Sequence, residues 1–204
     1  MKQYTFFSKL GDEYNEVLFY ILDNGQVYYD ERGFKYKEAE PIAITTYNPM
    51  YKIPEEVLPQ YVVQRYGSRF IIDYSRRFVE GIDEAGFVYS YGTRLYECNQ
   101  LHKAIEKIKQ HKWTRRATIT IRKPQDIDLD DPPCLTMLDF KLRHEGLSLY
   151  AVFRSHDMEN GYPLNWYALL MLLYHVATQL DVTPYRITTV SLSAHVYLWG
   201  RNLR

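Results

Sequence analysis

The sequence has only two cysteines, no excess of charge of either sign and no apolar run long enough to cross a bilayer. Its 25 basic and 25 acidic residues give a formal net charge of zero. A nucleic-acid-binding protein typically has a basic excess, so this balance argues against that class. Two cysteines are too few for a disulfide framework, and we therefore expect Cys98 and Cys134 to be free thiols in a reducing compartment.

The N-terminal segment has no long apolar core and no small-residue cleavage site of the kind found in secretory signals. The longest apolar run, WYALLMLLYHVA, covers residues 166–177 and lies between polar segments. It is too short for a transmembrane helix and indicates a buried helix instead. We therefore predict a cytoplasmic protein that contacts neither membranes nor nucleic acid.

The chain has 204 residues, of which 46% are hydrophobic, and this is enough for one domain with a sizeable core. No repeat, low-complexity tract or linker divides it, so we predict a single domain over residues 1–204. Two apolar runs around Asn24-Gly25 predict a β-hairpin, because Asn-Gly accommodates the positive φ angles of a type I′ turn.

The remaining patterns predict helices and strands in mixed order. Helical spacing extends over residues 54–80, with an interruption near Gly67, and residues 99–112 form a clearer amphipathic helix. The other predicted elements are strands at 38–47, 115–123 and 186–199, a pair of strands within 134–155 that turns at Glu145-Gly146, and an apolar helix at 165–180. This order indicates an α+β fold, with a mixed β-sheet packed against helices and the last helix buried at the centre.

Five short motifs follow one another in the second half of the chain. They are TRR at 114–116, PPC at 132–134, RSHD at 154–157, GYPLN at 161–165 and AHVY at 194–197. Any one of them alone carries little weight, since a cysteine is more often a small buried apolar residue than a nucleophile. In this order and spacing they resemble the thymidylate synthase family, and most of all its short archaeal and phage-type members. The resemblance covers about residues 91–204, whereas residues 1–90 are divergent.

The resemblance implies that the protein methylates dUMP to dTMP, with 5,10-methylenetetrahydrofolate as co-substrate and no metal. Carbon 5 of uracil is a poor nucleophile, and addition of a thiolate to carbon 6 makes the ring an enolate that attacks the one-carbon unit. Two prolines restrict the backbone before Cys134 and hold this thiol below the ring. A cation must lower the thiol pKa, and the resemblance gives this role to Arg154, which could otherwise be a surface arginine.

Asn165 precedes a predicted helix and could serve as its N-cap. Its amide can also accept from uracil N3–H and donate to O4, whereas cytosine presents the reverse pattern, so Asn165 favours dUMP over dCMP. His195 and Tyr197 alternate on one strand face and resemble the pair that holds the deoxyribose 3′-hydroxyl; they could also be a packed strand end. Asp157 resembles the folate-contacting carboxylate or else caps a loop. Tyr91 resembles the tyrosine that helps to remove the proton from carbon 5.

Arg115 and Arg116 are consecutive in a predicted strand, so their side chains should point to opposite faces. One chain could hardly bring both to a single phosphate. In the family, paired arginines reach the neighbouring subunit's site, which implies a homodimer with shared active sites. Guanidinium groups suit a phosphate dianion, and Ser155 would add a hydroxyl donor. The alternative is a solvated basic edge without a ligand.

The sequence also departs from the family pattern. Leu135 follows the nucleophile where histidine is usual, and Phe153 stands where glutamine is common. Arg32 is the candidate for a further phosphate-binding arginine. The sequence ends seven residues after Tyr197, without the tail that closes over folate in long members. Since hydride transfer requires the exclusion of water, two alternatives stay open: a hydroxymethylase acting on dUMP or dCMP, and a nucleotide-binding protein without catalysis.

Overall fold

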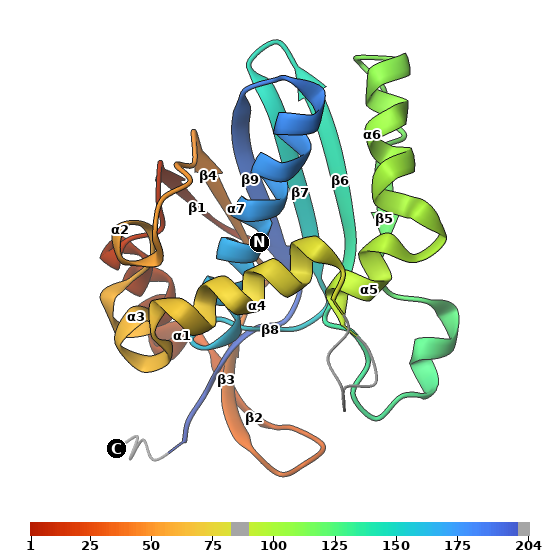
Figure 1. Cartoon of the computed structure of the whole chain (residues 1–204). Coiled ribbons are helices and arrows are strands. Elements are labelled where there is room, and N and C mark those ends of the chain that lie inside the picture. The colour runs from red at the N-terminus through yellow and green to blue at the C-terminus, as the bar shows by residue number, and fades with distance from the viewer. Residues whose placement is uncertain (83–89, 200–204) are drawn as a thin grey trace.

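The computed structural model describes residues 1–82 and 90–199, and the strands within them form two sheets (Figure 1). The six-stranded sheet has the order β1 (Lys2–Phe7), β4 (Ile42–Tyr47), β9 (Pro184–Ser191), β7 (Gly146–Phe153), β6 (Leu135–Arg143) and β5 (Thr118–Thr120). The four-stranded sheet has the order β2 (Gln26–Tyr29), β3 (Lys35–Ala39), β10 (Ala194–Tyr197) and β8 (His156–Asp157). Both sheets mix parallel and antiparallel pairs, as predicted for an α+β fold.

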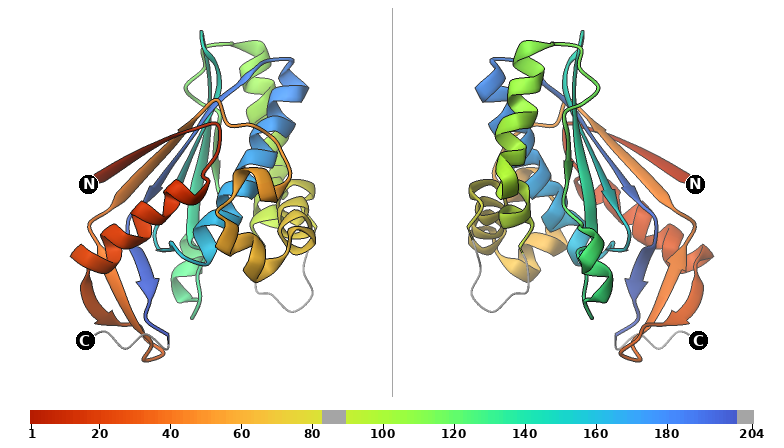
Figure 2. Two further views of the ribbon diagram at one scale, coloured as in Figure 1. Left: turned by 90° about the vertical axis from the view of Figure 1, so that its left-hand side faces the viewer. Right: turned by 90° about the vertical axis from the view of Figure 1, so that its right-hand side faces the viewer.

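Helices α4, α6 and α7 lie on one side of the six-stranded sheet (Figure 2). The α-helices are α1 (Asn15–Asn24), α2 (Pro54–Val57), α3 (Gln60–Tyr66), α4 (Ser68–Glu80), α5 (Tyr91–Tyr96), α6 (Gln100–Gln110) and α7 (Gly161–Leu180), and short 3-10 helices cover Asp12–Tyr14, Glu97–Asn99 and Pro124–Asp128. The interruption near Gly67 is confirmed, because Gly67 has a positive φ of 74° between α3 and α4. No helix in the described residues is long and apolar enough to cross a membrane.

Helix α7 is buried along nearly its whole length and forms the centre of the core, as its apolar sequence predicts. Trp166 is 1% exposed, and its indole N–H donates to the Thr46 hydroxyl in β4 at 3.1 Å. Residues in β4 and β9 alternate between buried and half-buried, so one face of the sheet packs on α7. The hairpin of β6 and β7 also forms as predicted, with His144 and Glu145 in its turn.

Four sequence-based expectations are wrong. The first apolar run before Gly25 is helix α1 and not a hairpin strand, because Val17, Leu18 and Ile21 recur at helical spacing and are buried together. Gly25 itself has φ −69°, so no type I′ turn forms. The predicted strand at 186–199 is two strands that belong to different sheets.

The third correction concerns the paired arginines. Strand β5 begins only at Thr118, so Arg115 and Arg116 lie in the loop between α6 and β5 and not in a strand. Helix α7 similarly begins at Gly161, and Asn165 is therefore inside the helix and does not cap it.

Candidate active site

Cys134 lies directly before β6, and Arg154 lies beside it, directly after β7. The Arg154 backbone N–H donates to the Cys134 carbonyl oxygen at 2.8 Å. The Arg154 guanidinium donates to the carbonyl oxygens of both preceding prolines, from Nε to Pro133 at 3.1 Å and from Nη2 to Pro132 at 2.5 Å. The thiol is thus carried by a segment that the proline rings and Arg154 both restrain.

The electrostatics of this thiol differ from the sequence-based expectation. Burial raises the pKa of Cys134 above its ordinary value and outweighs the Arg154 guanidinium, which lowers it. Two further groups oppose each other, since Asp131 raises the pKa and Arg122 lowers it. The expected cation is in place, but the thiol of this chain on its own is protonated at neutral pH. The pKa of the Cys134 thiol would fall below its ordinary value only if a cation beside it were less hydrated, or if a bound substrate changed this balance.

Tyr91 is the first residue of α5 and reaches the residue that follows the nucleophile. The Leu135 backbone N–H donates to the Tyr91 hydroxyl oxygen at 3.3 Å. A capping box fixes the start of α5, in which the Thr93 backbone N–H donates to the Ser90 hydroxyl at 3.0 Å. The Tyr91 ring also packs edge-on against Phe78, with 5.7 Å between the ring centroids. Local sequence and packing therefore hold the phenol beside the PPC segment.

Asn165 is 7% exposed, and both ends of its amide are hydrogen-bonded. Its Oδ1 accepts from the Tyr74 hydroxyl at 2.6 Å, and its Nδ2 lies 3.0 Å from His156 Nε2. An asparagine amide has two N–H donors and two acceptor lone pairs. These two contacts leave one donor and one acceptor for a ligand, which is the number that a pyrimidine edge requires.

Two stacked rings link the Asn165 amide to the strand pair that carries Cys134 and Arg154. Phe153 pairs with Leu135 across β6 and β7, and its ring stacks on His156 at a centroid distance of 3.9 Å. His156 in turn contacts the Asn165 amide. Asn165 is thus connected through His156 and Phe153 to the end of the β6–β7 pair at which Cys134 and Arg154 lie.

His195 and Tyr197 lie on the same face of β10, as predicted, with their rings edge to face at 5.2 Å. Burial lowers the pKa of His195, and the nearby Asp157 carboxylate opposes this shift. The Tyr197 hydroxyl donates to Asp30 Oδ2 at 3.2 Å and accepts from Arg32 Nη2 at 3.0 Å. Arg32 therefore brings a further guanidinium to this pair of residues.

Asp157 caps the loop before α7, which is the alternative that its isolated position allowed. Its Oδ1 accepts from the backbone N–H groups of Glu159 and Asn160, each at 3.0 Å, and its Oδ2 accepts from Asn160 Nδ2 at 2.9 Å. Ser155 is half-buried between Arg154 and the buried His156. No group of three or more potential metal ligands occurs in the described part of the chain.

Arg115 and Arg116 lie far from Cys134 of the same chain. The Phe140 backbone N–H donates to the carbonyl oxygen of Ala117, so the arginine pair is level with the far end of β6. Phe140 is six residues beyond Cys134, which corresponds to about 20 Å along a strand. An arginine side chain cannot span that distance, so these two cannot reach the thiol of their own chain.

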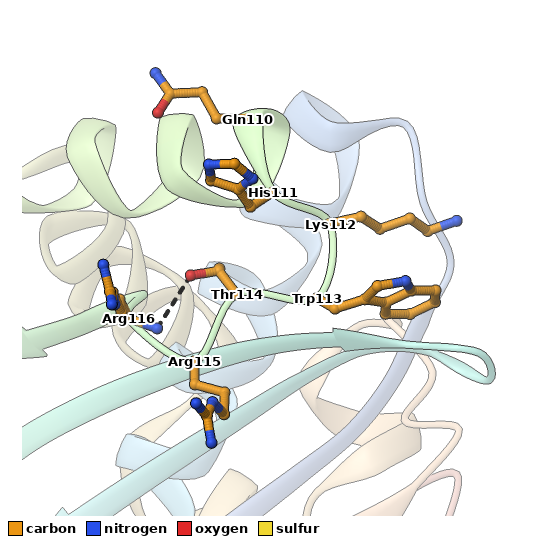
Figure 3. Close-up of a pocket in the computed structure, with 7 residues that line it drawn as sticks. All are labelled: Gln110, His111, Lys112, Trp113, Thr114, Arg115 and Arg116. Carbon is orange, nitrogen blue, oxygen red and sulfur yellow. Dashed lines mark hydrogen bonds between the residues drawn. The ribbon is translucent and has the colours of Figure 1, made fainter.

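The loop that carries the arginines borders an open surface pocket of about 570 Å³, which residues 110–116 line (Figure 3). Arg115 and Arg116 point to opposite sides of the loop, as expected, and both are exposed. Lys112 lies over the Trp113 ring at 5.2 Å, and this ring contacts His144 of the β6–β7 turn at 4.7 Å. In the described residues, neither arginine guanidinium has a hydrogen-bond or ion-pair partner.

The fold and this arrangement of residues agree with comparisons to known proteins. A family model described as "Thymidylate synthase" matches residues 71–200. A protein of Methanosarcina mazei named "Putative thymidylate synthase" is 36% identical over 194 residues, with 92% of this chain and 86% of that protein covered. One of the same name from Methanothermobacter thermautotrophicus is 32% identical over 203 residues, covering 93% and 91%.

The fold is also similar to that of a solved protein. The crystal structure of thymidylate synthase from T4 phage aligns with a TM-score of 0.74 at 18% identity, covering 92% of this chain and 77% of that one. Together, these findings define the class of the protein, which has an α+β fold of the thymidylate synthase type. The chain belongs to the thymidylate synthase family.

Three residues near the candidate site were not identified from the sequence. Arg122 lowers the thiol pKa, Tyr74 holds the Asn165 oxygen, and His156 contacts the Asn165 nitrogen. Arg122 and Tyr74 lie in segments that carry none of the five motifs. His156 lies inside RSHD, next to residues that were singled out, and its chemistry could have drawn attention to it.

Proposed function

We propose that this protein methylates dUMP at carbon 5 with 5,10-methylenetetrahydrofolate, as one domain that spans residues 1–204. The observation that carries the proposal is the juxtaposition of a restrained thiol, Cys134, with the Arg154 guanidinium and the Tyr91 phenol. The Asn165 amide is linked to this end of the β6–β7 pair through His156 and Phe153, and it retains one donor and one acceptor. These groups suit a reaction in which a nucleophile attacks a ring that a polar side chain holds in register.

In the proposed reaction, the Cys134 thiolate adds to carbon 6 of uracil, and the negative charge moves to carbon 5 and O4. Carbon 5 attacks the methylene carbon of the co-substrate, and one of the two C–N bonds of that carbon breaks. Loss of the proton on carbon 5 to solvent near Tyr91 then breaks the second C–N bond, which leaves an exocyclic methylene on the nucleotide and releases tetrahydrofolate. Hydride transfer from the tetrahydrofolate to the exocyclic methylene, with release of Cys134, gives dTMP and dihydrofolate. The Arg154 cation favours the thiolate, which is the form that adds.

The phosphate of dUMP is proposed to bind Arg115 and Arg116 of a second copy of the chain. The separation of about 20 Å along β6 rules out the arginine pair of the same chain. Ser155 and Arg32 are candidates for additional donors to the nucleotide, while His195 and Tyr197 would contact its sugar. The active sites would accordingly be shared within a homodimer.

The sheet offers a surface for this second copy. Thr45, Tyr150, Arg186 and Thr188 lie on the face turned away from α7 and are half-buried in the single chain. Arg186 Nε is buried and, among the described residues, has no hydrogen-bond partner. A buried donor without a partner costs about 1–3 kcal/mol, so a partner from another chain would stabilise this face.

The proposal is tested by trapping the covalent intermediate. In 5-fluoro-dUMP, fluorine replaces the proton that must leave carbon 5, so the adduct with Cys134 and the folate should accumulate. We expect an increase in intact protein mass equal to both molecules, located on the peptide that contains Cys134. Binding of the nucleotide without a covalent adduct would contradict the proposal and favour a nucleotide-binding protein.

The final step is tested by weighing the nucleotide product of dUMP, with dCMP in a parallel reaction. A methyl increment on dUMP is the expected result. A hydroxymethyl increment would show that water and not hydride reaches the methylene, and the protein would then be a hydroxymethylase. A product from dCMP alone would contradict the role given to Asn165.

A further inference from the structure

His156 is a buried histidine that touches the base-reading amide and has no role in the chemistry described so far. It is 2% exposed, its Nε2 lies 3.0 Å from Asn165 Nδ2, and its Nδ1 lies 3.0 Å from the Ser191 hydroxyl. The ring is held between Phe153, stacked at 3.9 Å, and Tyr162 at 5.1 Å. It is therefore fixed in position, with one nitrogen committed to each neighbour.

The protonation of this ring follows from its surroundings. Burial lowers the pKa of His156 to about 3, with a smaller contribution from His195. The imidazole is consequently neutral at physiological pH, and one nitrogen carries a proton while the other accepts. Which nitrogen accepts determines which end of the Asn165 amide can face it.

Tyr74 defines the orientation from the other side of the amide. A phenol is a better donor than acceptor, and its hydroxyl lies 2.6 Å from Asn165 Oδ1. Oδ1 therefore faces Tyr74, and Nδ2 faces His156 and donates to Nε2. The proton of His156 then belongs on Nδ1, where it is donated to the Ser191 hydroxyl. One set of hydrogen bonds is thus consistent for all four residues and leaves one donor and one acceptor of the amide unused.

We propose that His156 is a positioning residue for substrate specificity, which as the Nδ1–H tautomer holds the Asn165 amide in a single orientation. The unused N–H and lone pair of the amide would then meet a bound base in a fixed order. Uracil and cytosine present opposite donor and acceptor patterns, so an amide that cannot flip matches only one of them. Without His156, only Tyr74 would oppose rotation about the Asn165 Cβ–Cγ bond, and the flipped amide that matches cytosine would become more accessible.

This inference rests on the proposed function, because it assigns His156 to the discrimination between dUMP and dCMP. The proposed function concerns chemistry at Cys134, whereas the inference concerns the choice of base. Nucleotide binding without the folate co-substrate separates the two, since it requires no turnover.

The experiment measures the dissociation constants of dUMP and dCMP by calorimetry for the wild type and three variants. His156→Leu removes the acceptor, and the preference for dUMP should fall about tenfold, the effect of losing one buried hydrogen bond. His156→Gln offers an amide oxygen near the position of Nε2 and should restore most of the preference. Tyr162→Phe is the matched control, because Tyr162 packs on His156 but its hydroxyl contacts Thr189 and not the amide.

A role that is only structural would give a different pattern. His156→Leu would then lower the melting temperature and weaken the binding of dUMP and of dCMP equally. The ratio of their dissociation constants would be unchanged, and this result would overturn the proposal. If His156→Leu does not fold, Ser191→Ala removes the acceptor of Nδ1–H and should lower the ratio by a smaller factor. An unchanged ratio in Ser191→Ala would also overturn it.

The tautomer is measured independently of any nucleotide, by the nitrogen chemical shifts of the His156 ring in labelled full-length protein at pH 7. We expect the proton of the neutral His156 ring on Nδ1. A proton on Nε2 would contradict the inference, whatever the result of the activity measurements. A wild type that binds dUMP and dCMP equally, with the proton on Nδ1, would contradict the specificity role while leaving the chemistry at Cys134 to be judged by the adduct.

Discussion

The Asn165 amide and the arginine pair in the loop before β5 differ in how much of their hydrogen-bonding capacity their own chain uses. The amide is buried and bonded at both ends, to Tyr74 and to His156. Arg115 and Arg116 are exposed, and in the described part of the chain their guanidinium groups have no partner. One end of the proposed nucleotide site is thus complete within a single chain, and the other is not.

This difference follows from the cost of burial. An unpaired polar group inside a protein costs about 1–3 kcal/mol, so a buried amide must be bonded before any ligand arrives. Exposed cations are solvated and can remain unpaired in the free protein at little cost. Recognition of the base should therefore be set by one chain, whereas recognition of the phosphate should depend on a second chain and on protein concentration.

The largest expected effect comes from substitution of the thiol, because the proposed reaction requires it in addition to correct binding of the base and of the phosphate. Cys134→Ala should abolish turnover, because it removes the group proposed to add to carbon 6, while dUMP binding should change by less than about threefold. Product formation and calorimetric binding measure the two quantities. Cys98→Ala is the control, since Cys98 is exposed and should retain full activity. Turnover that survives Cys134→Ala would remove the covalent mechanism.

Removal of both loop arginines should affect the phosphate end alone. Arg115→Ala combined with Arg116→Ala should raise the KM for dUMP about 100-fold, because two charged hydrogen bonds to a dianion are lost. The ratio of dUMP to dCMP binding should stay unchanged, since both nucleotides carry the same phosphate. Lys112→Ala, in the same surface pocket, should change the KM by less than about threefold. An equally large increase in KM for Lys112→Ala would indicate that the loop attracts the nucleotide only through its positive charge and not through specific contacts of the arginines.

Substitution of the amide should affect the base end alone. Asn165→Asp should lower kcat/KM for dUMP by about 100-fold, because a carboxylate cannot donate to O4 and would repel it. Binding of inorganic phosphate should be unaffected, and dCMP should gain relative to dUMP. Steady-state kinetics with both nucleotides provide the measurement, with the exposed Asn99→Asp as control. An unchanged preference would show that another residue reads the base.

A smaller effect is expected on stability at acid pH. The pKa of His156 is lowered to about 3 in the folded chain, whereas in the unfolded chain it is near 6.5. The unfolded state therefore binds the extra proton between these values, and the free energy of unfolding should fall as pH decreases through this window. The expected loss is about 1 kcal/mol per pH unit below pH 6, relative to His156→Gln. Urea denaturation from pH 7 to pH 4 measures it, and parallel curves for both proteins would contradict it.

Hydrophobic patterns in the sequence correctly predict those helices and strands that do not depend on contacts with distant parts of the chain. Helix α7 is apolar on nearly every side, and the β6–β7 hairpin has strands of clear alternation, so both form as expected. The Asn24-Gly25 pattern does not produce the expected hairpin turn, because turn propensity there competes with the burial of Val17 and Ile21, and burial in the core decides the outcome.

The candidate site could be predicted only where it is carried by motifs. Cys134 and Arg154 meet because β6 and β7 are neighbours, which the hairpin already suggests. Tyr74 and Asn165 are separated by 91 residues, and no local pattern indicates that they touch. The balance of burial against charge at the thiol is likewise a property of the packed structure.

The most direct test of the shared site mixes two variants that should each have almost no activity at a dUMP concentration near the wild-type KM. One carries Cys134→Ala, and the other carries Arg115→Ala and Arg116→Ala. If sites are shared between chains, random exchange of subunits makes half of the dimers mixed, each with one complete site, and activity should return to about one quarter of the wild-type value. An absence of recovery, with exchange of subunits demonstrated by mass spectrometry, would contradict the shared site.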